Sequence, residues 1–376
     1  MRVTQAQWTA SAGWTGLDAI AADSQLVLVF GAGEALAWPG VLDALRARVP
    51  RAVVAGCSTS GEIAGTRVFD HSIVATAATF EATHVRTTST PIEGDADSFV
   101  AGHRLASSLQ GPDLTHVLVF SDGLAVNGSQ LAAGLAGTLG DDVQVTGGLA
   151  GDGTAFARTF VVADGRVSSG TATAVGLYGS RLRIGCASLG GWEPFGPERL
   201  VTRARGNVLY ELDGQSALTL YKKYLGPHAA GLPASALLFP LAVRESGREA
   251  VVRTVLSVDD DAQSMTFAGD VPEGAHARLM KSNVDRLIDG ATGAARGCAA
   301  GSGDTTAELA LLISCVGRKL VLKQRTEEEV EAVRAVVGPG ATLTGFYSYG
   351  EISPFAAGGR CRLHNQTMTI TTLSEA

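Results

Sequence analysis

Two stretches of the chain place a carboxylate directly after a glycine at the end of an apolar run. The first is Gly56-Cys-Ser-Thr-Ser-Gly-Glu-Ile63, and the second is Gly345-Phe-Tyr-Ser-Tyr-Gly-Glu-Ile352. The carboxylates of Glu62 and Glu351 could bind an amino or guanidino group of a ligand. They could equally hydrogen-bond amides of the turn, which is a common use of acidic side chains beside tight turns. The sequence supports both interpretations.

A thiol and two hydroxyls lie in the first of these turns, on Cys57, Ser58 and Thr59. A nucleophile needs a neighbouring base, and no base stands at a recognisable spacing. The stretch also differs from the G-x-S-x-G elbow of hydrolases. A hydrolase using Cys57 or Ser58 is therefore the least favoured hypothesis, and we expect no catalytic residues. A turn that offers backbone N–H groups to an anion or another ligand fits the glycines better.

A third glycine-rich turn is Gly147-Gly-Leu-Ala-Gly-Asp-Gly153. It lacks the lysine of a phosphate loop and the G-x-G-x-x-G spacing of a dinucleotide site. We expect its glycines to permit close backbone packing or the approach of a ligand, which makes Asp152 a candidate ligand contact. Asp122 and Asn127 follow the preceding apolar run and could reach the same cleft. Capping the helix that follows is an equally good use of either side chain.

Aromatic and histidine side chains complete the set of candidates. Tyr347 and Tyr349 could line a pocket, because each combines apolar area with a hydroxyl. His71 and His364 are expected at the start of two equivalent Thr-rich strands. Each could ligate haem iron, or could fix a nearby loop through a ring hydrogen bond. No C-x-x-C-H motif occurs, so any haem would be bound non-covalently.

The elements that must position these residues follow one repeated pattern. Apolar runs at 26–30, 116–120 and 310–314 each lead to a helical stretch, a second apolar run, a glycine-rich turn and a further strand. Such self-similar order marks repeated units. The continuous apolar runs are typical of strands buried on both faces. Because ligands collect at the carboxyl ends of strands in open α/β sheets, we expect the three turns to converge near pockets.

These patterns predict an α/β protein of the mixed α+β type, built from repeated β-α-β-β units with mixed sheets. A different segment, without the repeat, separates the second copy from the third. We place a domain boundary there, which gives domains at 1–215 and 216–376. Within the second domain we expect a helix at 277–291 and a flexible linker at 296–304, where Gly, Ala and Ser dominate.

Composition excludes several classes of partner. The chain has 376 residues and a net charge of −7, without a block of Lys or Arg. Binding to nucleic acid or to an anionic membrane surface therefore has little electrostatic support. No apolar stretch of about 18 residues predicts a membrane span, and the N-terminus lacks a signal-peptide pattern. Five widely spaced cysteines fit a reducing cytoplasm better than a zinc or disulfide framework.

Nine motifs, in order, resemble those of the FIST family of sensory proteins, and together they span about residue 24 to residue 373. They are GCSTSGEI at 56–63, VLVFSDGLAVNG at 117–128, GGLAGDG at 147–153, GW-x-P-x-G at 191–196, GNVLYELDG at 206–214, FPLAV at 239–243, GDVPEG at 269–274, GFYSYGEISP at 345–354 and LHNQTMTITTL at 363–373. The last motif contains Asn365, which is a further candidate for ligand binding.

The resemblance implies N-terminal and C-terminal FIST domains and a cytoplasmic role in bacterial signal transduction. Family members are thought to bind small ligands, such as amino acids or other metabolites. Some stand-alone members bind haem, sense nitric oxide and act on a histidine kinase. Because the FIST parts fill this sequence, we expect a separate partner protein, such as a histidine kinase. The resulting hypothesis is a small-molecule sensor, with a haem-based nitric-oxide sensor as the alternative.

Overall fold

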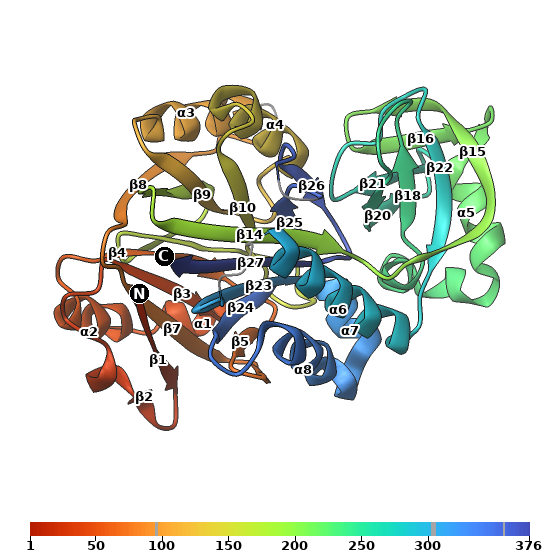
Figure 1. The fold of residues 1–376 in the computed structure, drawn as a ribbon. Coiled ribbons are helices and arrows are strands. Elements are labelled where there is room, and N and C mark those ends of the chain that lie inside the picture. Colours follow the sequence, from red (N-terminus) through yellow and green to blue (C-terminus); the bar gives the residue numbers. More distant parts are fainter. Residues whose placement is uncertain (95–96, 302–305, 356–357) are drawn as a thin grey trace.

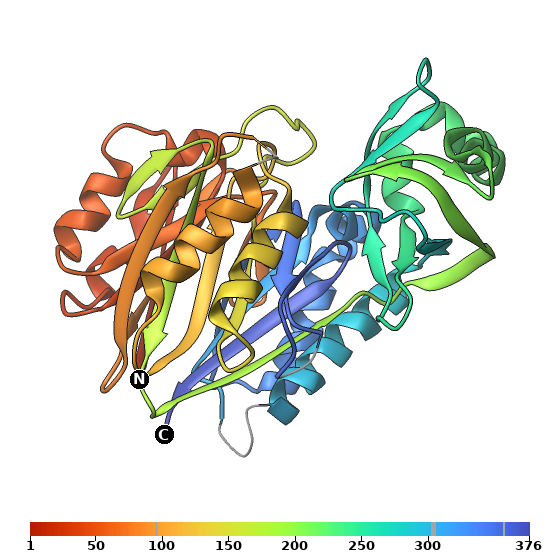
Figure 2. The same ribbon diagram turned by 90° about the horizontal axis from the view of Figure 1, so that it is seen from above.

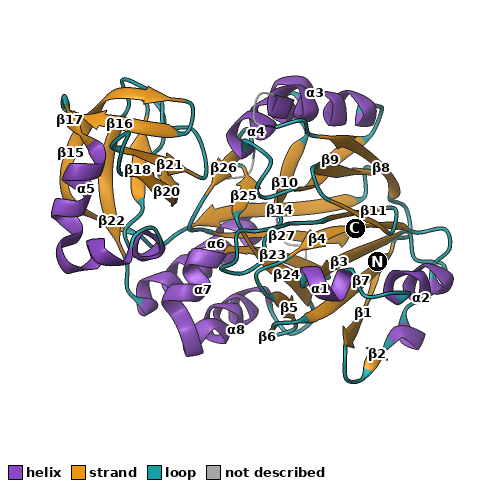
Figure 3. Ribbon diagram, turned by 180° about the vertical axis from the view of Figure 1, so that it is seen from behind, coloured by secondary structure: helices purple, strands orange, loops and turns teal. Residues whose placement is uncertain are grey.

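The computed structural model describes residues 1–94, 97–301, 306–355 and 358–376. Three β-sheets face one another at the centre, and helices cover their outer faces (Figure 3). A fourth sheet forms a separate lobe at one side of this body (Figures 1 and 2). The predicted mixed α+β fold is confirmed.

The three central sheets repeat one arrangement. In each, a parallel pair of strands lies beside a third strand that runs antiparallel to the pair, and a fourth strand pairs antiparallel with the third. The strand orders are β4-β3-β7-β1, β10-β9-β13-β8 and β24-β23-β27-β14. The first unit contains β1 (Arg2–Thr9), β2 (Gly13–Thr15), β3 (Leu26–Gly31), α1 (Gly33–Leu36), α2 (Val41–Arg48), β4 (Val53–Ser58) and β7 (Ser72–Thr79).

The other two units contain the corresponding elements. The second has β8 (His84–Pro91), α3 (Ser98–Leu109), β9 (Leu114–Ser121), α4 (Gly128–Leu139), β10 (Gln144–Leu149) and β13 (Thr171–Tyr178). The third has β14 (Leu182–Leu189), α6 (Val284–Gly301), β23 (Leu309–Cys315), α7 (Val316–Leu322), α8 (Thr326–Val337), β24 (Thr342–Ser348) and β27 (Met368–Glu375).

Each unit also donates a hairpin to the sheet of another unit. The hairpin of β5 (Glu62–Ala64) and β6 (Arg67–Phe69) pairs with β24 of the third unit. That of β11 (Val161–Ala163) and β12 (Arg166–Ser168) pairs with β4 of the first. That of β25 (Gly350–Ser353) and β26 (Arg362–His364) pairs with β10 of the second. Through these three exchanges each unit is joined to the other two, and we call the resulting closed arrangement the ring of units.

The core at the centre of the ring is apolar. Phe30, Phe120 and Phe346 come from different units, and their ring centroids lie 4.7 to 6.2 Å apart. All three side chains are fully buried. Rings at these separations attract one another beyond the gain from burial alone, so this cluster holds the three sheets together.

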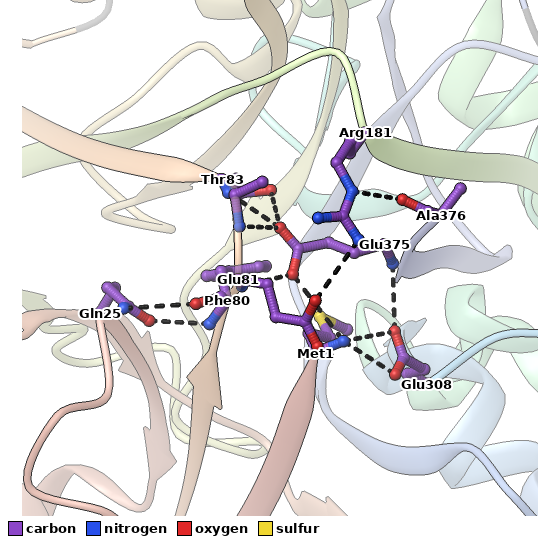
Figure 4. Close-up of polar contacts among 10 residues, drawn as sticks. Met1, Gln25, Phe80, Glu81, Thr83, Arg181, Glu308, Glu375 and Ala376 are labelled. Atoms are coloured by element: carbon purple, nitrogen blue, oxygen red, sulfur yellow. Dashed lines mark hydrogen bonds and ion pairs between the residues drawn. The ribbon is translucent and has the colours of Figure 1, made fainter.

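Polar contacts tie the chain ends to the junction between the first two units (Figure 4). The Glu375 carboxylate accepts hydrogen bonds from the amides of Glu81 and Thr83 at 2.6 and 2.8 Å. The amino group of Met1 lies 2.9 Å from the carboxylate of Glu308. The last strand of the third unit is thereby joined to the connection between units one and two.

The lobe at the side is inserted between β14 and α6. Its strands are β15 (Glu193–Arg205), β16 (Val208–Leu212), β17 (Gln215–Ser216), β18 (Leu241–Arg244), β19 (Val251–Arg253), β20 (Val255–Asp259), β21 (Ser264–Phe267) and β22 (His276–Lys281), and α5 (Ala217–Leu225) packs against β16 and β21. A core of its own, which includes Leu209, Tyr221 and Phe267, is buried within this lobe. We call residues 193–281 the inserted lobe.

The domain boundary expected between residues 215 and 216 lies at β17, which pairs with β16 in the sheet of the inserted lobe. The helix predicted at 277–291 is wrong in position: β22 occupies its start, and α6 continues to Gly301 through most of the predicted linker. Small residues serve close packing there, because a Cβ on Gly297 would lie 3.0 Å from Ala187 of β14. Residues 302–304 of that linker lie outside the described part.

Candidate functional site

The three glycine-rich turns meet, but they pack directly against one another. Ser58 donates from Oγ to the carbonyl of Gly151 at 2.9 Å, and the Gly153 amide donates to Ser60 Oγ at 3.0 Å. The Ser60 amide donates to the carbonyl of Tyr347 at 2.8 Å. Ser58 and Ser60 are buried. The turns therefore converge as expected, and they form a packed junction instead of the walls of an open pocket.

Glu62 and Glu351 make the same contacts in two copies of the turn. Thr59 donates to Glu62 Oε1 at 2.5 Å, and the Ser72 hydroxyl donates to Oε2 at 2.7 Å. Ser348 and Thr367 bind Glu351 in the same way, at 2.6 and 2.9 Å. Both carboxyls are fully buried, and burial raises their pKa values to about 7 and about 8. Each glutamate thus fastens its turn to the strand that follows.

The candidate nucleophiles are already engaged. The Ser58 hydroxyl donates to Gly151 and accepts from the amide of Phe160 at 2.9 Å. Cys57 is fully buried, and burial raises the pKa of its thiol well above the usual value. A neutral thiol is a weak nucleophile. Among the described residues, neither side chain is hydrogen-bonded to a base.

The aromatic candidates and Asp152 also serve the packed junction. Tyr347 is fully buried and donates its hydroxyl proton to Glu329 Oε1 at 2.7 Å. Tyr349 hydrogen-bonds Asp152, whose carboxylate also accepts from the amides of residues 156–158. The ring of Phe156 stacks on Tyr349 with centroids 4.6 Å apart. Asp152 therefore shapes the loop above the junction.

The two histidines do not occupy equivalent positions, which corrects the sequence analysis. His364 pairs with Glu351 as Phe69 pairs with Glu62. The counterpart of His71 is Gln366: both have positive φ angles, 58° and 63°, immediately before the residue that binds the glutamate. The shared Thr-rich strands concealed this offset of two residues.

Neither histidine is arranged as a haem ligand. His364 is buried, its Nε2 lies 2.9 Å from the carbonyl of Ser353, and burial lowers its pKa to about 4. His71 lies on the surface, where its Nδ1 contacts Glu34 at 2.5 Å. One ring nitrogen of each histidine is thus engaged, and the other has no hydrogen bond to the described residues. An axial ligand also needs an apolar cavity beside its ring, whereas His364 packs against Phe355 with ring centroids 4.5 Å apart and His71 lies in solvent. The surroundings of the two histidines do not fit haem.

Asp122, Asn127 and Asn365 have separate roles. Asp122 accepts from the amides of Leu124 and Ala125, both at 2.8 Å. Asn365 donates to the carbonyl of Tyr349 at 3.4 Å, while its own Oδ1 is buried without a hydrogen-bond partner in the described part of the chain. Asn127 caps α4 by accepting from the Gln130 amide. Its amide nitrogen points elsewhere, towards the inserted lobe.

A cleft of about 840 Å³ lies between the ring of units and the inserted lobe. One wall is the outer side of α4, with Ser129, Gln130 and Ala133. The second is formed by β18 and β19 of the inserted lobe, and the third by β26 and the residues just before it. Figure 1 shows α4 and β26 of the ring on the side that faces the inserted lobe. A volume of this size suits a small organic ligand.

Family motifs that lie far apart in the sequence meet at the edge of this cleft. Asp270, from the GDVPEG motif, accepts from the side-chain amides of Asn127 and Gln130 at 2.7 and 2.6 Å. Arg253 donates to the carbonyl of Leu363, in the LHNQ motif, at 2.9 Å. Of the residues predicted from sequence, Asn127 alone takes part in these contacts.

Sequence reasoning missed Gln130, Arg253 and Asp270. A signal existed for Asp270, because it stands in a motif that was recognised. Gln130 follows the VNG motif by two positions and could have been considered with it. Arg253 carries no local signal: it is one of the 30 basic residues, and only the fold brings it to the cleft.

Comparison with known proteins gives the family. A model of the FIST N domain matches residues 25–215, and a model of the FIST C domain matches residues 217–354. The chain therefore belongs to the FIST family. FIST domains are sensory domains that bind small ligands in signal transduction.

Individual relatives add little. An uncharacterized protein of Methanocaldococcus jannaschii, MJ1623, is 25% identical over 161 residues, which are 39% of this chain and 31% of the relative. The chain thus matches less than a third of that protein. A solved structure of cyanuric acid hydrolase from A. caulinodans aligns over 100% of this chain and 99% of its own, with a TM-score of 0.37 and 11% identity. A likeness this distant carries no inference. In the described residues, no helix has the length and apolarity to cross a bilayer.

Proposed function

We propose that this chain is a cytoplasmic small-molecule sensor whose ligand, an amino acid or another metabolite, occupies the cleft between the ring of units and the inserted lobe. The observation that carries the proposal is the cleft itself: its walls come from both parts of the molecule, and family motifs meet at its edge. All five cysteines are free and buried, which suits a reducing compartment.

The packed junction of turns serves as the scaffold in this proposal. Its polar groups are satisfied by one another, so a ligand would have to displace existing hydrogen bonds to bind there. We propose that the chain binds its ligand without converting it. In support, Cys57 is buried and Ser58 is bonded to the backbone, so the two candidate nucleophiles are engaged in the packed junction.

A ligand in this cleft can be reported to a partner through the position of the inserted lobe. Two adjacent connections join the lobe to the ring, near Gly191 and near Ser282, whose hydroxyl donates to the Gly191 carbonyl at 2.9 Å. A ligand that touches both walls favours whichever spacing of the walls it fits best. A separate signalling protein, such as a histidine kinase, would read that spacing.

Differential scanning fluorimetry with a broad metabolite panel tests the proposal. A ligand that binds only the folded protein raises its Tm by mass action. Ala133 is exposed on α4 and faces the cleft, so Ala133→Trp fills the site without entering the core. Ala47→Trp, at an exposed position of α2, is the matched control.

We expect at least one compound to raise the Tm of the wild type and of Ala47→Trp, and to lose its effect on Ala133→Trp. If no compound raises the Tm, or if the increase persists in Ala133→Trp, the cleft is not the ligand site.

A further inference from the structure

We propose that the ligand carries an anionic oxygen group, a carboxylate or a phosphate, which binds Arg253 at the floor of the cleft with Arg362 beside it. This inference rests on the cleft being the ligand site and adds the chemical class of the ligand. It comes from the charges that line the cleft and from their unequal pairing.

Arg253 is a buried cation without a carboxylate partner. Its side chain comes from β19, and only 4% of the residue is exposed. Nε donates to the carbonyl of Asp270 at 3.0 Å and Nη1 to that of Leu363 at 2.9 Å. Within the described part of the chain, no carboxylate oxygen lies within 4.0 Å of this guanidinium. Its direct hydrogen-bond partners are therefore neutral, and the carboxylates of Asp270 and Glu245 act on its charge only from beyond contact distance.

The other three arginines of the cleft already have acidic neighbours. Arg248 and Arg362 share one carboxylate, Glu245, at 3.0 and 3.2 Å. Arg360 binds Asp141, which lies outside the cleft, at 2.6 Å. Arg253 thus lacks a carboxylate in contact with it among the described residues, and Arg362 shares its carboxylate with Arg248. Burial lowers the pKa of Arg253, and the nearby Arg362 lowers it further. The carboxylates of Asp270 and Glu245 oppose these effects. Two cations therefore lie close together at the floor of the cleft, and no carboxylate of the described part directly contacts Arg253.

The guanidinium of Arg253 also has hydrogen-bonding capacity left. It carries five N–H groups. Three are used, the third in a long contact of 3.4 Å from Nη2 to Ser129 Oγ. The two remaining N–H groups belong to Nη1 and Nη2, a pair of nitrogens that can bind carboxylate or phosphate in a bidentate manner. An anion there would supply a counter-charge in direct contact with the guanidinium, which no carboxylate of the described residues does.

The positions of Arg253 and Arg362 connect binding of the anion with the proposed signal. Arg253 belongs to the inserted lobe, whereas Arg362 belongs to β26 of the ring, and β19 packs against β26. An anion held by both side chains bridges the two parts of the molecule. A neutral analogue of the same ligand would lack this bridge.

Calorimetric titration of the compounds found by fluorimetry tests the inference. Carboxylates are compared with their methyl esters and amides, and phosphate monoesters with the parent alcohols, which separates the two sources of anionic oxygen. Each is titrated into wild type, Arg253→Met, Arg362→Met and Arg203→Met. Arg203 is the control because it lies in the same lobe, on the surface, paired with Glu211.

We expect the bound compounds to be anionic and their neutral analogues to bind at least about tenfold more weakly, since a hydrogen bond to a charged group contributes enough for that ratio. Arg253→Met and Arg362→Met should weaken binding by a similar factor, and Arg203→Met should not. If Arg253→Met fails to fold, Arg362→Met decides.

The inference is overturned if compounds that depend on an open cleft, judged by Ala133→Trp, are neutral or cationic, or if anions bind both arginine variants as tightly as the wild type. In those cases the cleft remains the ligand site. If no compound depends on the open cleft, the proposed function fails as well.

Discussion

At the scale of single residues, Glu62 and Glu351 show where sequence reasoning stops. Their equivalence could be read from the repeated G-E-I motif. Their role could not, because the groups that bind their Oε2 atoms, Ser72 and Thr367, lie 10 and 16 residues further along the chain. Only the folded turn shows that both carboxyls are enclosed by hydroxyl and amide donors.

The two buried carboxyls make stability depend on pH. Their folded pKa values, about 7 and about 8, lie above the ordinary value of 4.5. Their contribution to stability is therefore complete below about pH 4.5 and is lost as the pH rises through 7 and 8. We expect the double variant Glu62→Gln and Glu351→Gln to gain stability relative to the wild type as the pH rises from 5 to 8.5, by on the order of 2 kcal/mol per site.

Urea unfolding at intervals across this pH range measures the effect. Other titrating groups are common to both proteins, so the difference between them isolates the two glutamates. A difference in the free energy of unfolding that stays constant with pH would show that these carboxyls are ionised throughout.

Three glycines occupy one equivalent position at which a side chain cannot fit. A Cβ on Gly345 would lie 1.8 Å from the carbonyl oxygen of Leu312, and Gly56 and Gly147 meet Val29 and Val119 in the same way. We expect Gly345→Ala to lower the free energy of unfolding by roughly 3 kcal/mol, because the parallel strands must separate. Gly137→Ala is the control, since nothing lies within 4 Å of its added Cβ. Equal effects of the two substitutions would contradict this account.

At the scale of elements, the repeat was predictable and the exchange of hairpins was not. Periodic apolar runs gave β3, β4, β9, β10 and β23 close to their observed positions. The sequence contains no information that β5 should pair with β24 instead of β4, because the spacing within a repeat is the same for either partner. At the end of α6, composition was misleading in a different way. The Gly and Ala residues there suggested a flexible linker, but they serve close packing against β14.

A buried ion pair connects these elements to the inserted lobe. Arg318 of α7 binds Glu329 of α8 at 2.7 Å, and both side chains are fully buried. Arg318 also donates to the carbonyls of Gly190 and Leu287, next to the connections that lead to the lobe. Glu329→Gln should leave a buried guanidinium without its counter-charge and lower stability by about 3–5 kcal/mol.

Chemical denaturation of Glu329→Gln and of Glu328→Gln checks this expectation. Glu328 forms an exposed pair with Arg325, where the solvent screens the charges, so its substitution should change stability little. Should the two variants unfold at the same denaturant concentration, the buried pair does not stabilise the third unit.

At the scale of the whole molecule, the candidate site lies between segments that are far apart in the chain. Its walls come from residues near 130, 250 and 362. The resemblance to the FIST family supplied motifs from all three regions, but no spacing rule could say that Asn127 and Asp270 touch. Sequence reasoning therefore gave the fold class and the repeat. It placed the candidate ligand contacts at the turns, whereas we propose the cleft as the ligand site.

The contact of Asp270 with α4 should hold the inserted lobe near the ring. Asp270→Asn replaces one acceptor by an amide that faces the side-chain amides of Asn127 and Gln130. We expect this change to weaken the contact between the inserted lobe and α4 by about 1–3 kcal/mol. Amide hydrogen exchange should become faster at the start of α4 and stay the same in the core of the lobe. Asp261→Asn, at an exposed position of the same lobe, should leave exchange unaltered. Unchanged exchange in Asp270→Asn would mean that other contacts fix the lobe.

The location of the ligand is the central claim, and a crystal structure with the most strongly stabilising compound tests it most directly. The account predicts ligand density between α4, β19 and β26, with an anionic group next to Arg253. Density at the packed junction around Glu62 and Glu351, with the cleft empty, would contradict it.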